Sequence, residues 1–163
     1  MTTTRRVLLG ALGITLMGLS CAGISAQPIA TCSEAEGYAY FHHSLLVPKE
    51  KSGFEKDKIG GGLFTLQLLE NGEYDVLFVD VRKQIISFKQ DGGLVQLVRK
   101  GASDATFLLI FPGMVIELYT IYVDASGAKK FDLLQSKGGD RMPIHKSSVM
   151  TGLCSQLNLQ LLK

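Results

Sequence analysis

Short apolar runs that alternate with polar residues constrain the fold of this chain more than any other feature. In the stretch GLFTLQLLENGEYDVLFVDV, Phe64, Leu66 and Leu68 alternate with polar residues, which is the period-two pattern of a half-buried strand. The pair Asn71-Gly72 follows, and it predicts a two-residue hairpin turn because both central positions of a type I′ turn need a positive φ. Two antiparallel strands are therefore expected on either side of this pair.

The same pattern continues along most of the chain. Runs such as QIISFK, LVQLVR, TFLLIF, MVIELYTIYVD and KKFDLLQ are separated by Gly, Pro, Asn and Asp residues, and an earlier strand is expected at Gly37–His43. No helix of a dozen residues fits between these runs, so sequential hairpins are expected instead of crossovers. We predict an all-β fold: a small antiparallel β-sandwich or barrel of about seven to eight strands.

Two segments are less regular. Residues 49–58 carry mixed charge without an apolar period, which favours a solvated loop. Near the end of the chain Val149, Leu153 and Leu157 repeat every four residues, as in a short helix, whereas the leucines from 157 to 161 alternate, as in a strand. We favour a short C-terminal helical turn through Cys154, followed by an extended tail.

The N-terminus has the three zones of a secretory signal. Arg5 and Arg6 precede an apolar run from Val7 to Ser20, and small residues follow up to Ala26. The run is too short for a transmembrane helix, which needs about 20 residues, and no later stretch predicts a membrane span. We predict a signal peptide at residues 1–26, cleaved after Ala26, and a single β-rich domain at residues 27–163. The protein is expected to be exported to the periplasm or beyond.

Two features refine the export prediction. The stretch TRRVLL resembles a bacterial twin-arginine export signal, although an ordinary secretory signal can also begin with two arginines. Leu19-Ser20-Cys21 resembles a lipoprotein cleavage site, but Gly18 stands where that pattern has a large aliphatic residue. This mismatch argues against a lipid anchor at Cys21.

Removal of the predicted signal changes both charge and cysteine content. The two arginines account for the whole excess of 17 Lys and Arg over 15 Asp and Glu, so the remaining chain is neutral. A nucleic-acid partner normally requires a basic surplus, and none is expected here. Cys32 and Cys154 remain, and two cysteines in an exported chain most simply form one disulfide. The alternatives are two free thiols or a metal pair, but the spacing matches no ligand motif.

The most function-like stretch is QSKGGDRMPIHKSS. Its charged residues surround two glycines and a proline, and loops on rigid β scaffolds commonly carry binding residues. A locally basic loop can recognise an anionic or carboxylate-bearing partner even on a neutral protein. The alternative is a solvated connection with no ligand. The candidate binding residues are Lys137, Asp140, Arg141, His145 and Lys146.

No phosphate loop, nucleotide fingerprint, zinc-protease helix or serine elbow is present. Adjacent histidines on a strand point to opposite faces, so His42 and His43 cannot bind one ion together. No metal site, cofactor or catalytic residue is therefore predicted, and the sequence leans away from an enzyme. We favour a non-catalytic binding or inhibitory module whose partner is a protein or an anionic envelope ligand. A structural envelope protein and a hydrolase-type enzyme around His145 are the alternatives.

Overall fold

One antiparallel sheet contains all nine strands of the described chain. The computed structural model describes residues 26–79 and 82–162, so almost the whole predicted signal segment, with Cys21, lies outside the described residues. The elements are β1 (Gln27–Phe41), η1 (Lys49–Lys51), β2 (Gly53–Leu68), β3 (Tyr74–Val79), β4 (Ile85–Ser87), β5 (Leu94–Lys100), β6 (Asp104–Phe111), β7 (Val115–Val123), β8 (Lys129–Lys137), β9 (Lys146–Leu157) and η2 (Leu159–Leu161).

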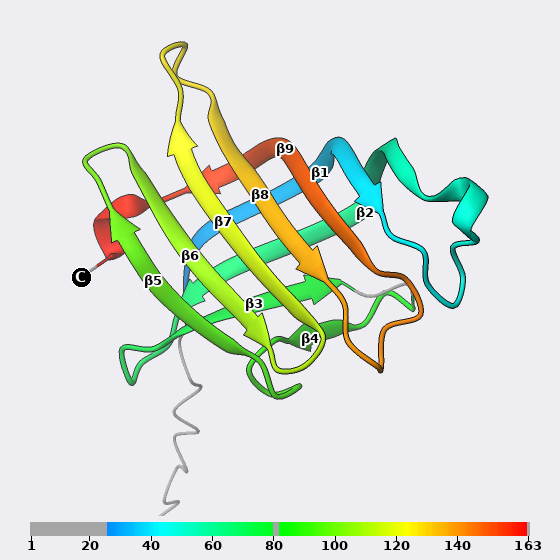
Figure 1. Cartoon of the computed structure of the whole chain (residues 1–163). Coiled ribbons are helices and arrows are strands. Elements are labelled where there is room, and N and C mark those ends of the chain that lie inside the picture. Colours follow the sequence, from blue (N-terminus) through cyan, green and yellow to red (C-terminus); the bar gives the residue numbers. More distant parts are fainter. Residues whose placement is uncertain (1–25, 80–81, 163) are drawn as a thin grey trace, which may run out of the picture.

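The strand order shows how the chain closes on itself. It is β4-β3-β2-β1-β9-β8-β7-β6-β5, so the first and last strands of the chain are neighbours in the middle of the sheet. The sheet curls strongly, and β1, β2 and β3 cross behind β6, β7 and β8 (Figure 1). The all-β antiparallel prediction is confirmed. The finer prediction of a closed sandwich or barrel of about seven to eight strands differs from the structure, which is a curled half-barrel of nine strands.

The core lies on the concave side of this curl. Phe107 and Phe131 are fully buried there, and the Phe64 ring packs edge-on against the rings of Tyr119 and Phe131 at centroid distances of 4.8 and 4.9 Å. Phe64 comes from the β1–β4 half of the sheet, whereas the other rings come from β6–β8. The aromatic core therefore holds the two halves of the curl against each other.

Cys32 and Cys154 form a disulfide across β1 and β9. The two residues are directly opposite each other in the sheet, and their separation in sequence is 122 residues. This confirms the predicted bridge. It also corrects the predicted helical turn, because Cys154 lies within β9 and the only turn of helix in this region of the described chain is η2, which begins at Leu159.

The reason for that error is geometric. Residues four apart lie on one face of a helix, but they also lie on one face of a strand, whose period is two. Val149 and Leu153 are 62% and 53% exposed on one side of β9, while Met150 and Cys154 are buried on the other. The leucine spacing could not separate the two possibilities.

Four smaller predictions also need correction. β1 begins at Gln27, ten residues before the expected start of the first strand. Residues 53–58 belong to β2 because they pair with β1, so only the first part of 49–58 is a loop. The hairpin at Asn71-Gly72 exists, but Leu69 and Glu73 close a longer turn in which only Gly72 has a positive φ, of 82°. The connection from β4 to β5 is not a hairpin, since it joins the two ends of the sheet.

The disulfide should contribute strongly to stability. In the chain-entropy model, a loop of this length gives an upper value of about 5 kcal/mol. We expect reduction to lower the urea midpoint of the wild-type protein, measured by circular dichroism, and to leave the midpoint of the Cys32→Ala/Cys154→Ala double variant unchanged. Equal midpoints for the wild type with and without reductant would show that the bridge is dispensable.

Candidate functional site

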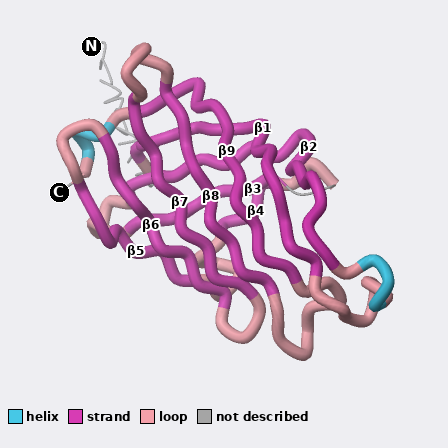
Figure 2. Tube along the Cα trace, turned by 45° about the horizontal axis from the view of Figure 1, so that its top comes forward, coloured by secondary structure: helices cyan, strands magenta, loops and turns pink. Residues whose placement is uncertain are grey.

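Three loops meet at one end of the half-barrel, which we call the loop end. They are residues 42–52 after β1, residues 112–114 after β6 and residues 138–145 after β8. Backbone hydrogen bonds tie them together: Leu46 N donates to Pro143 O at 3.1 Å, and Gly138 N donates to Met114 O at 2.9 Å. Figure 2 shows the η1 turn and the neighbouring loops at this end of the strands.

The loop end carries exposed apolar and charged side chains side by side. A depression of about 490 Å³ is lined by Leu45, by residues 139–143 and by His145. Leu45 is 86% exposed and Leu46 is 62% exposed. Within the described part of the chain, neither Asp140 nor Arg141 forms a hydrogen bond or an ion pair. The depression therefore presents an uncovered leucine and an unpaired guanidinium to the solvent.

The histidines have local partners. His42 N donates to the carbonyl oxygen of His145 at 2.9 Å, and His145 Nε2 lies 3.2 Å from Gly139 O. His43 Nδ1 lies 2.9 Å from Val47 O. None of these contacts involves a carboxylate, and the described residues contain no group of three or more side chains that could hold a metal ion. The imidazoles of His43 and His145 and the backbone of His42 therefore hold the two loops in shape.

Below the loops, the concave face of the sheet changes from apolar to polar in three successive rows. The deepest row is Phe107, Tyr119, Leu133 and Met150, which are opposite one another on four neighbouring strands. The next row places Glu117, Gln135 and Ser148 opposite one another, all buried. The row nearest the loops pairs Lys137 with Lys146.

The two lysines are held in different ways. Lys146 Nζ donates to the carboxylate of Asp57 on β2 and lies 5.6 Å from the centre of the Phe41 ring. Burial lowers the pKa of Lys137, and the charge of Lys146 acts in the same direction, while the carboxylates of Glu117 and Asp57 oppose the shift. Lys146 thus forms an ion pair with Asp57. Lys137 lies beside Lys146 and is a partly desolvated cation.

Glu117 is a buried carboxyl group in the middle of this polar face. Burial raises its pKa above the usual range, although hydrogen bonds from Gln135 and Tyr119 and the nearby lysine charges act against the shift. Gln135 Nε2 donates to Glu117 Oε1, whereas Gln135 Oε1 has no partner within the described residues. Burial therefore favours the neutral form of Glu117 more than it is favoured in water.

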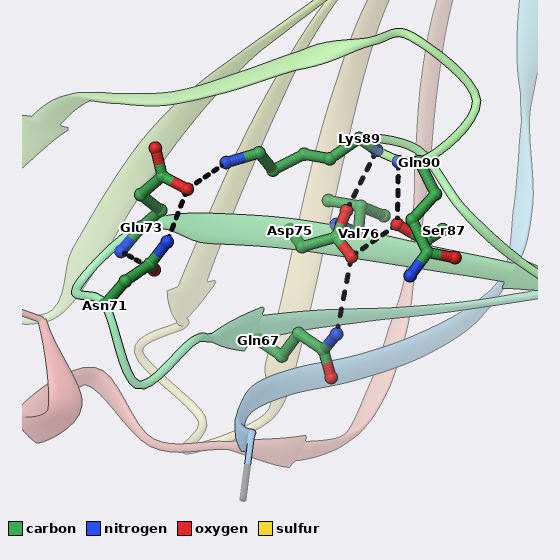
Figure 3. A network of polar contacts seen from close by, with 8 residues as sticks. All are labelled: Gln67, Asn71, Glu73, Asp75, Val76, Ser87, Lys89 and Gln90. Carbon is green, nitrogen blue, oxygen red and sulfur yellow. Dashed lines mark hydrogen bonds and ion pairs between the residues drawn. The ribbon is translucent and has the colours of Figure 1, made fainter. Parts of the chain in front are cut away.

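A second buried carboxylate, Asp75 on β3, has a complete set of partners instead. It accepts hydrogen bonds from Val76 N at 2.8 Å, from Ser87 Oγ at 2.7 Å and from Lys89 N at 3.1 Å. Figure 3 shows these bonds together with the bond from Gln67. Because Ser87 and Lys89 belong to β4 and the turn after it, their bonds to Asp75 hold this segment against β3 and stabilise the sheet edge.

The structure divides the five residues predicted as binding residues. Asp140, Arg141 and His145 lie together in the exposed depression, whereas Lys137 and Lys146 are neighbours on the concave face below it. Sequence analysis missed Leu45, which lies in a different loop, and Glu117. A signal for Glu117 existed, because in MVIELYTIYVD it shares a strand face with Tyr119 and Ile121 and is the only charged residue on that face.

No protein-family model, curated protein or solved structure matches this chain. The chemistry of the loop end itself therefore points to what the site can do. Leu45 offers apolar contact, and the guanidinium of Arg141 offers a fork of donors that fits a carboxylate. The helices of the described chain are two short turns, and neither is long enough to cross a membrane.

The raised pKa of Glu117 predicts a pH dependence of stability. A carboxyl group whose pKa is higher in the folded state stabilises the fold fully only below its unfolded value of 4.5, and this contribution is lost as pH rises through the folded value. We expect the free energy of unfolding of the wild type to fall over this range, by about 1.4 kcal/mol for each pH unit that separates the folded and unfolded pKa values. Glu117→Gln should remove the fall.

Urea unfolding between about pH 3 and 8 measures this difference. Glu73→Gln is the matched control with the opposite sign, because hydrogen bonding to Lys89 lowers the pKa of Glu73. Its contribution is present above the unfolded pKa and is lost as pH falls. Parallel profiles for the wild type and Glu117→Gln would contradict a raised pKa at Glu117.

Proposed function

We propose that this protein is an exported, non-catalytic binding module that docks a partner protein at its loop end. The partner would offer an apolar side chain to Leu45 and a carboxylate to Arg141. One observation carries this proposal: the depression at the loop end combines an 86% exposed leucine with a guanidinium that has no partner in the described chain. Arginine is enriched among binding hot spots, and exposed apolar surface beside it can mark an interaction site.

The way the loops are built supports a binding role. The loops after β1 and β8 are tied to each other by backbone hydrogen bonds, so the depression between them is held in shape before any partner arrives. A preformed surface loses less conformational entropy on binding than a flexible one. Lys137 lies at one end of the loop 138–145 and adds positive charge to its base, whereas the charge of Lys146 at the other end is paired with Asp57.

Export is part of the same proposal. The disulfide between Cys32 and Cys154 is compatible with an oxidising compartment, where such bonds persist. The predicted signal at residues 1–26 would deliver the chain there, and a protein that begins at Gln27 would carry no net charge. The partner is therefore expected among proteins of the same compartment.

A photo-crosslinking amino acid placed at Leu45 tests the docking site directly. In cells that make the full chain, we expect a discrete crosslinked product with the mass of the chain from Gln27 plus one partner. The same crosslinker at Leu153, an exposed leucine on β9, is the matched control and should not give this product. Arg141→Ala should reduce the product at position 45 about tenfold or more, as expected for a lost charge-assisted hydrogen bond.

Two results would contradict the proposal. The first is equal crosslinking at positions 45 and 153, which would show that the loop end has no special role. The second is a strong product at position 45 that Arg141→Ala leaves unchanged, which would remove the guanidinium from the site. Arg141 is exposed and unpaired within the described residues, so its replacement should leave the urea midpoint at the wild-type value.

A further inference from the structure

The convex face of the sheet carries an uncharged apolar stripe. Five side chains lie directly opposite one another on five neighbouring strands, from β6 through β7, β8 and β9 to β1. They are Leu108, Leu118, Leu134, Val149 and Tyr38. Leu134, Val149 and Tyr38 are 49%, 62% and 57% exposed. We call these five residues the apolar stripe.

The next row toward the loop end is also uncharged. Ile116 is opposite Ser136, Ser136 is opposite Ser147, and Ser147 is opposite Tyr40. Ile116 is 53% exposed, and Phe54, the β2 neighbour of Tyr40, is 78% exposed. The uncharged surface is therefore two rows deep in this direction.

Charged residues border the stripe at its β2 end, where Lys56 is opposite Tyr38, and along its other side. There the outward row contains Asp132 on β8, Glu36 on β1 and Lys58 on β2. An antiparallel sheet normally presents polar side chains on its solvent face, so an uncharged apolar band across five strands is unusual. Contiguous exposed apolar surface of this kind marks an interaction site.

We propose that a second copy of this chain covers the apolar stripe, and that the two copies form a symmetric dimer through their convex faces. A two-fold axis places the same surface of both copies in contact. Such a dimer is therefore favourable only where the surface does not bring like charges together. The stripe meets this condition because none of its five side chains is charged. Its face-to-face packing buries apolar groups and leaves no ion uncompensated.

The stripe can form only the apolar centre of a dimer interface, and the residues around it must supply the rest of the area. Strands lie about 4.8 Å apart, so the stripe spans about 20 Å across five strands. A stable interface needs about 800 Å² from each partner, with an apolar centre and a polar rim. The stripe and the row of Ile116 provide the centre, and the row of Asp132 and Glu36 provides one rim.

The other route to a symmetric dimer, through a free strand edge, is opposed by charge. Within the described residues, 53–59 of β2 pair only with β1, which leaves a backbone edge open. On this edge Glu55 and Asp57 point to one face, and Lys56 and Lys58 point to the other. Antiparallel pairing of two identical edges keeps each face with itself and would place like charges opposite each other. The convex face has no such obstacle.

Sedimentation equilibrium of the purified protein tests the dimer. We expect the wild type to have twice the mass of one chain at micromolar concentration, and Val149→Lys to have the mass of one chain. Leu153→Lys is the matched control, because Leu153 lies on the same strand and the same face but outside the stripe, and it is similarly exposed. This variant should remain a dimer. A second variant, Leu134→Lys, should also be monomeric.

Other outcomes would overturn the proposal. A wild type that is monomeric throughout the micromolar range, or a Val149→Lys variant that stays dimeric, would show that the stripe does not join two copies. A monomeric wild type that binds phosphatidylcholine–phosphatidylglycerol vesicles, with binding lost in Val149→Lys, would assign the stripe to a membrane surface. Urea midpoints of both lysine variants equal to that of Leu153→Lys exclude unfolding as the cause of a lower mass.

Discussion

The pairing of β1 with β9 is the interaction on which the rest of the structure depends. Without it, the chain would form two separate meanders, β1–β4 and β5–β9, each with an open edge. The disulfide from Cys32 to Cys154 crosses this seam, and Gly37 allows the two backbones to meet: a Cβ atom at residue 37 would lie 2.1 Å from Val149 O. The aromatic core packs between the two halves that the β1–β9 pairing joins.

The pairing of β1 with β9 also brings the loops of the loop end together. The loop 42–52 leaves the end of β1, and the loop 138–145 enters the start of β9, so the same pairing that closes the sheet brings Leu45 beside Arg141. It aligns the rows of the concave face in the same way, with Lys146 of β9 reaching Asp57 of β2 across β1. Each of these contacts joins segments that are far apart in the sequence. Weaker pairing of β1 with β9 would therefore lower the free energy of unfolding and also change the shape of the loop end.

The local sequence pattern was sufficient to predict most strands, but it was not sufficient to predict their order in the sheet. Alternation such as that of Phe64, Leu66 and Leu68 depends only on neighbouring residues, so the antiparallel strands and most turns could be predicted. The single curled sheet could not, because strand order is decided by contacts between distant segments. The same limit applies to the site. Arg141 and His145 are close in sequence and were predicted as binding residues, whereas Leu45 lies beside them only because of the fold. Glu117 could be recognised as unusual only once its burial was known.

The free energy of unfolding of Gly37→Ala, compared with that of Gly60→Ala, tests the role of the seam most directly. Both glycines lie in the long strands β1 and β2, but a Cβ at Gly60 has no atom within 4 Å, whereas one at Gly37 meets the β9 backbone. We expect Gly37→Ala to lose about 3 kcal/mol, as for a forced overpacking of backbone, and Gly60→Ala to stay within about 0.5 kcal/mol of the wild type. Equal stability of the two variants would show that close approach of β1 and β9 does not hold this fold together.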